Sequence, residues 1–184
     1  MKCVKCMALM AAACGLVWMA GCASTPKVAI REPVGPAPSG PQNVSAQGRL
    51  EVYSARQTEP LAENLGEWEW EYGIGDIALA DGLARTGYII RTENGRAFKY
   101  VPNVKSPTDP EPTLVTLPPG RYQVEAQAEE ADGKRVTVVL PVLIDPGKTT
   151  VAHLSGHWKP KAQFSESDVV RLPDGQIAGW LARQ

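Results

Sequence analysis

Apolar and polar residues alternate along much of the chain beyond residue 48, which is the pattern of strands with one buried face. In residues 122–129, Gln or Glu occupies every second position between apolar residues. A turn at Asp132-Gly133 separates this run from residues 134–144, which place five branched apolar residues on one face: Val136, Val138, Leu140, Val142 and Ile144. The two runs predict two successive strands.

Shorter runs predict further strands at residues 50–54, 87–92, 96–101, 113–117 and 149–154. Asn94-Gly95 lies between two of them and indicates a hairpin, because both residues tolerate positive φ. Pro141 cannot donate a hydrogen bond to a neighbouring strand, so we expect residues 134–144 to form an edge strand or to be bulged there. A short helix could lie within residues 59–65. About seven short strands predict an all-β fold, an antiparallel β-sandwich.

The first residues have a different pattern, with no alternation at all. Lys2 and Lys5 form a cationic start, and residues 7–20 follow without a charge. Fourteen residues make only about 21 Å of helix, whereas a bilayer core needs roughly 20 apolar residues. This stretch therefore predicts the core of a signal peptide rather than a membrane span.

The apolar run ends in Met19-Ala20-Gly21-Cys22, which resembles the bacterial lipobox. Ala20 and Gly21 match the small residues of that motif, and Met19 stands where leucine is usual. The resemblance implies cleavage between Gly21 and Cys22, and acyl chains on the sulfur and the new amino group of Cys22. Two or three acyl chains anchor a protein durably. Ala23 and Ser24 follow, rather than Asp, and by resemblance this favours the outer membrane, facing the periplasm, over the inner membrane.

Domain boundaries follow from these changes of composition. We expect a signal peptide at residues 1–21, a lipidated Cys22 with a Pro-rich linker at 22–47, the β-sandwich at 48–158, and a C-terminal extension with a short hairpin at 159–184. Five prolines in residues 23–47 favour an extended spacer over a helix or a central strand. A lone hairpin is marginal in water, so we expect the C-terminal one to dock Trp180 on the sandwich or on a partner, with its own domain favoured.

Two segments resemble a known sandwich. Residues 117–126, Leu-Pro-Pro-Gly-Arg-Tyr-Gln-Val-Glu-Ala, and residues 142–151, Val-Leu-Ile-Asp-Pro-Gly-Lys-Thr-Thr-Val, look like the strands of carboxypeptidase regulatory-like domains. With residues 172–180 they are similar to a group of uncharacterised bacterial lipoproteins. The resemblance implies an Ig-like, transthyretin-like sandwich. It implies no peptidase site, because the regulatory-like domain carries none.

The net charge and the cysteine content limit which partners and cross-links are expected. Removal of Lys2 and Lys5 with the leader leaves 17 basic and 20 acidic side chains, a formal charge of −3. A chain without a basic stripe is not expected to bind nucleic acid. Cys3, Cys6 and Cys14 lie in the leader, so the mature chain keeps Cys22 alone and can form no internal disulfide.

The most unusual motif is Glu67-Trp68-Glu-Trp70-Glu-Tyr72. In a strand it would place Trp68, Trp70 and Tyr72 on one face and three carboxylates on the other. The aromatic residues could pack into the core, or they could form a candidate ligand-binding face for sugars or apolar partners. Paired-carboxylate glycosidase chemistry is the least favoured interpretation, because such carboxylates converge from separate elements.

His153 and His157 are the only histidines. A spacing of four residues suits a helical metal site, but in a strand these positions lie about 13 Å apart. We therefore expect a structural or exposed role, rather than a metal ligand or a general base, and no cofactor. The sequence favours a non-catalytic, membrane-anchored module of the cell envelope that binds envelope proteins or glycans. A carbohydrate-binding module using Trp68, Trp70 and Tyr72 comes second, and a hydrolase third.

Overall fold

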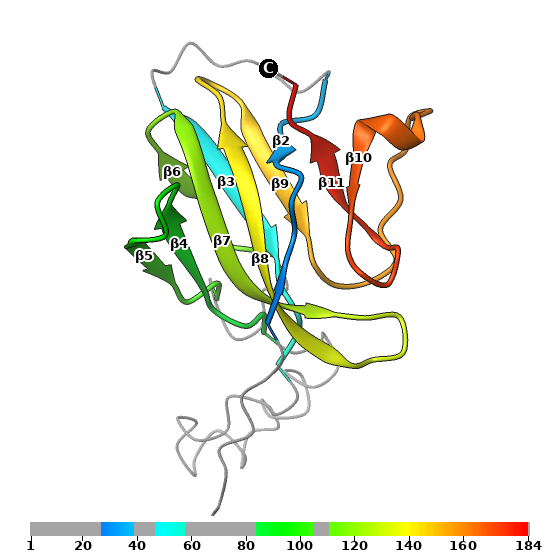
Figure 1. Cartoon of the computed structure of the whole chain (residues 1–184). Helices are drawn as coiled ribbons and strands as arrows, with labels where there is room; N and C mark the ends of the chain where they lie inside the picture. The colour runs from blue at the N-terminus through cyan, green and yellow to red at the C-terminus, as the bar shows by residue number, and fades with distance from the viewer. Residues whose placement is uncertain (1–26, 39–46, 58–83, 105–110, 184) are drawn as a thin grey trace, which may run out of the picture.

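Two β-sheets pack face to face in the computed structural model, which describes residues 27–38, 47–57, 84–104 and 111–183 (Figure 1). The larger sheet has the strand order β10-β11-β2-β8-β7-β4-β5, with β1 also paired to β8, and the smaller has the order β6-β3-β9. The prediction of an all-β sandwich is confirmed. The sheets are mixed rather than purely antiparallel, because β1 and β2 run parallel to β8, and β3 runs parallel to β9.

The two longest strands form the centre of the larger sheet. β7 (Gly120–Glu129) and β8 (Arg135–Ile144) pair antiparallel over ten residues, and Gly133 takes a φ of 81° in the turn between them. Their apolar positions are buried as the alternation predicts, because each strand has one face on the smaller sheet.

The predicted hairpin at Asn94-Gly95 is also confirmed. β4 (Tyr88–Thr92) pairs with β5 (Ala97–Val101), and Gly95 has a φ of 82°. The register shifts between Ile90 and Arg91, which marks a bulge in the ladder. β5 ends the sheet, and Phe98 and Tyr100 on it are exposed.

The smaller sheet covers the inner face of the larger one. It consists of β6 (Val115–Leu117), β3 (Gly48–Tyr53) and β9 (Thr149–His153). The buried core between the layers draws on both sheets and includes Leu50, Val52, Tyr88, Ile90, Val124, Leu140 and Ala152.

Residues 27–38 differ from the expectation of an extended spacer. β1 (Lys27–Ala29) and β2 (Val34–Gly35) belong to the larger sheet, and β2 lies between β8 and β11. Proline lacks the amide donor but keeps the carbonyl acceptor, and Pro33 uses it to accept a bond from the Ala182 amide at 2.8 Å. Such short strands need few donors, so flanking prolines do not exclude them.

Pro141 gives a second correction. β8 is not an edge strand, and its pairing with β7 runs through Gln123↔Pro141 without a register shift. The carbonyl of Val139 accepts from the Ile30 amide on the other side of β8, and residues two apart in a strand point their backbone groups the same way. The backbone nitrogen of Pro141, which has no hydrogen to donate, therefore points to the gap between β1 and β2. Residues 30–33 are not part of a strand there.

The predicted C-terminal hairpin is confirmed, and it docks on its own domain. A 3-10 turn (Glu166–Asp168) leads into β10 (Val169–Arg171), which pairs with β11 (Ile177–Leu181). β11 joins the larger sheet through β2, and Val170, Leu172 and Ala178 enter the common core. Trp180 lies with its ring edge-on to Phe164, 6.4 Å between centroids.

Candidate binding surface

Most residues singled out in the sequence lie outside the described part of the chain. This holds for Gly21 and Cys22, for Trp68, Trp70 and Tyr72, and for the helix expected in residues 59–65. The chain on either side of residues 58–83 is joined, since the Gln57 amide donates to the Ala84 carbonyl at 2.7 Å.

A column of stacked side chains stands at the end of the smaller sheet. The His153 ring lies between Tyr53, at 4.8 Å between centroids and 16° between planes, and Trp158, at 3.8 Å and 9°. The Arg85 guanidinium lies 4.7 Å from the centre of the Tyr53 ring. The Tyr53–His153 and Arg85–Tyr53 distances are in the range where stacking and cation–π attraction are effective, and the His153–Trp158 rings are closer still.

Local structure explains how the column is assembled. Tyr53 and His153 are direct partners in the parallel pair of β3 and β9, so their side chains leave the sheet on the same face. The chain then turns at Gly156, whose φ is 80°, and this turn returns Trp158 to the second face of the imidazole.

Burial and charge determine the protonation of the column. Burial, helped by the positive charge of Arg85, lowers the pKa of His153 to about 4, so the imidazole is neutral near pH 7. Burial and the hydrogen bond to Glu111, 3.1 Å from the hydroxyl, raise the pKa of Tyr53 to about 12. The Arg85 guanidinium donates hydrogen bonds to the Ser54 carbonyl at 2.9 Å and to the Ser155 hydroxyl at 3.3 Å.

The two histidines lie in different surroundings. Both faces of the His153 ring are covered, which fits the structural role expected for it. His157 is exposed and lines a cavity. Within the described ranges, no group of three or more His, Cys, Asp or Glu side chains is placed to hold a metal ion.

Two adjoining cavities lie beside the column, and Trp158 lines both. The first has a volume of about 450 Å³ and is lined by Trp158, Phe164 and Ile177, with His157, Arg171 and Asp174 at its polar side. The second, of about 440 Å³, is lined by Trp158, Trp180, Pro38 and Pro160, with Lys161 and Asp168. We call this surface the Trp158 groove, after the ring that the two cavities share.

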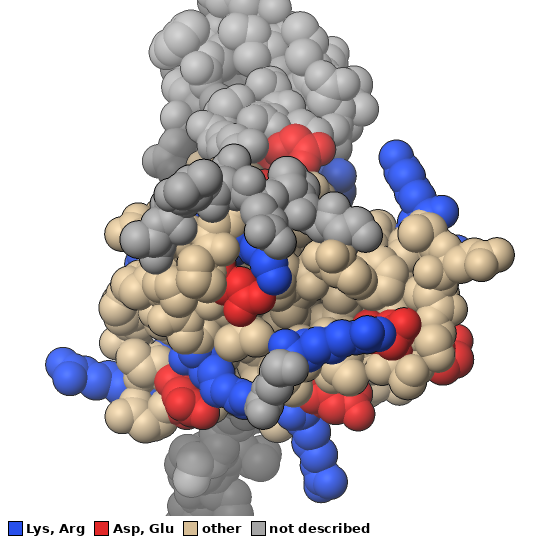
Figure 2. Space-filling view, turned by 90° about the horizontal axis from the view of Figure 1, so that it is seen from above, with Lys and Arg blue, Asp and Glu red and all other residues tan. Residues whose placement is uncertain are grey.

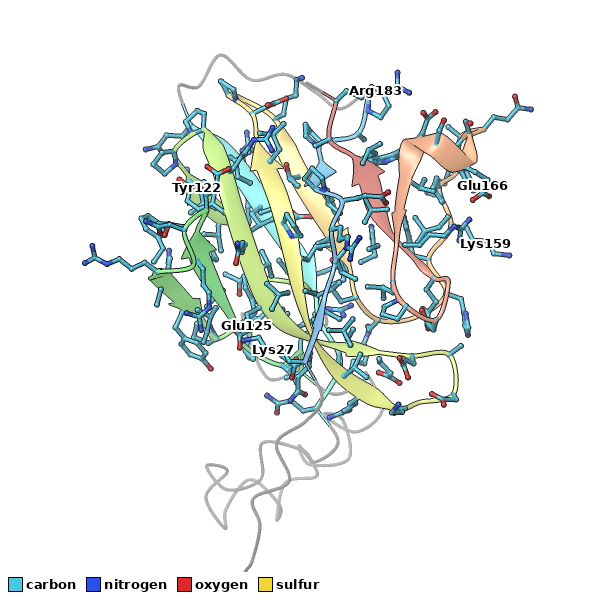
Figure 3. The ribbon with its side chains drawn as sticks, in the orientation of Figure 1. Lys27, Tyr122, Glu125, Lys159, Glu166 and Arg183 are labelled. Carbon is cyan, nitrogen blue, oxygen red and sulfur yellow. The ribbon has the colours of Figure 1, made fainter. Side chains whose placement is uncertain are left out.

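Only some of the charged side chains around the Trp158 groove form ion pairs with described residues. Arg171 pairs with Glu166 at 2.6 Å, and Arg183 pairs with Asp168 at 2.5 Å. Lys159 and Lys161 are exposed and form no ion pair with a described residue. Figure 3 shows Lys159 and Glu166 on the segment that links β9 to β10. The groove thus combines aromatic walls with free ammonium groups and side-chain amides, which suits non-covalent binding of a partly polar ligand.

Sequence reasoning did not single out Tyr53, Arg85, Trp158 or Phe164. The available signal was Trp158 and Phe164 in a stretch rich in Lys and Pro, residues 157–164, where no alternation gives an aromatic residue a core position. The column depends on the β3–β9 register, which joins Tyr53 to His153, one hundred positions apart.

No helix in the described part of the chain combines the length and the apolar character needed to cross a membrane. Comparisons of the chain with models of protein families, with curated proteins and with solved structures found no match.

Proposed function

We propose that the chain is an exported lipoprotein of the cell envelope. In this proposal the leader is cleaved before Cys22, acyl chains on Cys22 enter the membrane, and the β-sandwich presents a non-catalytic surface for binding a partner. The resemblance of residues 19–22 to the lipobox motivates the anchor. The outer membrane, facing the periplasm, is the proposed location because Ala23 and Ser24 follow the cysteine.

One structural observation supports this proposal most directly. Residues from Lys27 onward form two packed sheets with a buried core between them. Removal of residues 1–21 would therefore take nothing from the described sandwich or its core.

A binding role is supported by the Trp158 groove. His153, which stacks on the Trp158 ring, is covered on both faces and has a lowered pKa, which is poor for a general base at pH 7. His157 and Asp174 both line the first cavity, yet none of its described lining residues is Ser, Thr or Cys. A hydrolase therefore remains the third hypothesis.

Substitution of the proposed acylation site tests the anchor. We expect Cys22→Ser to move the protein from the membrane fraction to the soluble fraction, or to leave the leader uncleaved. Cys14→Ser is the matched control, because Cys14 lies in the proposed leader, and it should stay membrane-bound. Equal membrane retention of the Cys22→Ser protein, or an unmodified Cys22 in mass spectra of the native protein, would falsify the anchor.

A glycan is the second candidate ligand, and the groove gives a specific reason. Sugar rings stack on exposed aromatic faces, and Trp158 and Phe164 line the first cavity beside the Gln176 amide. We expect calorimetric titration with soluble peptidoglycan fragments to give binding that Trp158→Ala abolishes and Phe98→Ala, on β5, leaves intact. Loss of binding in a Trp68→Ala/Trp70→Ala protein instead would return the site to residues 67–72. Absence of any binding leaves a protein partner as the first hypothesis.

A further inference from the structure

We infer that the anchored sandwich faces the lipid surface with the end at which β1 starts and β7 turns into β8. This inference rests on the proposed acylation of Cys22. It adds to that proposal an orientation and a membrane-facing surface, neither of which follows from acylation alone.

The tether is short because the fold starts early. Only residues 23–26 separate Cys22 from Lys27, the first residue of β1. A fully extended chain spans at most about 3.6 Å per residue, so five steps reach roughly 18 Å. The α-carbon of Lys27 must then lie within about 18 Å of an acylated residue at the membrane surface. The expected spacer of residues 22–47 would have allowed several times that distance.

The anchor point on the fold is firmly held. Lys27 Nζ lies 2.7 Å from Glu125 Oε1, and the other carboxylate oxygen of Glu125 accepts from Arg91 Nε at 2.8 Å. The Ile30 amide donates to the Val139 carbonyl at 2.8 Å, just after the last paired residue of β1. Figure 3 shows Lys27 and Glu125 side by side near the lower end of the sheet. The tether therefore attaches to the sheet itself rather than to a second loop.

The register of β1 identifies which end of the molecule this is. Lys27 is paired with Thr137, the third residue of β8, directly after the turn that contains Asp132 and Gly133. Two other crossings lie at the same end: the Ala55 amide donates to Gln127, and the Glu129 amide to Leu154. In Figure 1 the start of β1 and the β7–β8 turn both lie in the lower part of the molecule.

The opposite end lies beyond the reach of the tether. β8 continues from Thr137 to Ile144, and seven steps at about 3.4 Å each place the following turn roughly 24 Å farther along the sheet. That turn, at Asp145 to Lys148, is closed by an ion pair of 3.2 Å. In the inferred orientation this end points away from the bilayer, where it is open to partners from the aqueous side.

The charges of the β7–β8 turn give no reason of their own for this orientation. The β7–β8 turn carries both signs, with Glu130 and Asp132 beside Lys134 and Arg135. Figure 2 shows the opposite end, where Lys and Arg side chains again alternate with Asp and Glu. Because the β7–β8 turn is not a patch of one sign, the inference rests on the length of the tether and not on charge.

Distance measurements with single thiols test the orientation. Acylation would consume the sulfur of Cys22, so a new cysteine would be the only thiol of the mature protein. Ala131→Cys marks the β7–β8 turn, and Arg121→Cys is the matched control near the far end of β7; both positions are exposed. A fluorescent donor on each thiol is read against acceptor-labelled phospholipid, in vesicles that carry the native acylated protein.

We expect several-fold stronger energy transfer from position 131 than from position 121. Equal transfer, as from a sandwich lying on its side, or stronger transfer from position 121, overturns the inference. A second variant inserts twenty Gly and Ser residues between Ser24 and Thr25, and it should lower transfer from position 131. Unchanged transfer after the insertion shows that the tether does not hold the orientation, and it also overturns the inference.

Failure of the underlying proposal gives a different result. Before each measurement, the tryptic peptide of residues 22–27 is weighed, since trypsin cleaves after Lys27. An unmodified peptide contradicts the proposed anchor itself. An acylated peptide with equal or reversed transfer contradicts only the orientation.

Discussion

His153 illustrates how packing can turn a titratable side chain into a structural one. Its ring is enclosed by Tyr53 and Trp158, and Arg85 stands on the far side of Tyr53. An imidazolium there would lose water on both faces and would lie near a guanidinium, so the neutral ring is favoured. The stability of the column should therefore depend on pH.

At the residue scale we predict that acid weakens the fold through His153. The histidine of the unfolded chain binds a proton near pH 6.5, whereas the folded one does so only near pH 4. Lowering the pH from 7 to 5 therefore favours the unfolded state, by about 2 kcal/mol. We expect His153→Phe, which keeps an aromatic ring, to remove that part of the loss in urea unfolding at the two pH values.

The exposed His157 supplies the control for this experiment. His157→Asn should keep the pH dependence of the native protein, because this side chain has no part in the column. If His153→Phe loses as much stability between pH 7 and pH 5 as the native chain, the titration of His153 is not the cause.

At the element scale, the C-terminal hairpin shows how closely β11 approaches its neighbours. A β-carbon added at Gly179 would lie 2.6 Å from Val34 Cγ1 and 2.9 Å from the Val151 carbonyl oxygen. The second of these is backbone and cannot rotate away. Glycine at this position therefore allows β11 to pack closely against both β2 and β9.

We predict that Gly179→Ala destabilises the docked hairpin by about 1–3 kcal/mol, as expected for overpacking of a closed site. Thermal unfolding of the full chain measures the effect. Gly175→Ala is the informative comparison, because its added β-carbon meets nothing within 4 Å, although its φ of 89° is itself unfavourable for alanine. A larger loss at Gly175 than at Gly179 would contradict close packing as the reason.

The same elements show what the sequence could reveal about the fold. The β7–β8 and β4–β5 hairpins were predictable because each is local: alternation marks the buried face, and Asp132-Gly133 or Asn94-Gly95 marks the turn. β1 and β2 were not, because their pairing is decided by β8, more than one hundred residues away, and not by their own composition. The Trp158 groove was missed for the same reason, since a distant register assembles the column beside it.

At the scale of the whole molecule, residues 27–38 join the C-terminal hairpin to the rest of the larger sheet. Among the described strands, β2 is the one that pairs with both β8 and β11. β1 and β2 pair with β8 of the sandwich, and β2 also pairs with β11 of the C-terminal hairpin. In the proposed lipoprotein, this same segment follows the anchor directly. Any pull on the anchor would act first on the β1–β8 ladder, so the Glu125 ion pairs stand at a mechanically important position.

We predict that Glu125→Gln loosens β1. The substitution removes the carboxylate that joins Lys27 to Arg91, at a cost of about 1 kcal/mol of unfolding free energy for a partly exposed pair. Trypsin should then cut faster after Lys27 and Arg31 under native conditions, because local opening of β1 exposes both sites. Glu130→Gln, which breaks the longer 3.7 Å pair with Lys134, should leave those cuts unchanged.

The same carboxylate should make the opening of β1 sensitive to acid. The hydrogen bond from Lys27, with the contribution of Arg91 and against the effect of burial, holds the pKa of Glu125 below its ordinary value. The stabilisation is therefore complete above the ordinary pKa of a glutamate and is lost as the pH falls through the lower pKa of the folded state. Hydrogen exchange of the Ile30 amide should accelerate in that range, after correction for the intrinsic effect of pH, and Glu125→Gln should be fast throughout. If the native chain and Glu125→Gln exchange Ile30 at the same rate at neutral pH, β1 is held by its backbone pairing alone, and the ion pairs do not secure the junction with the anchor.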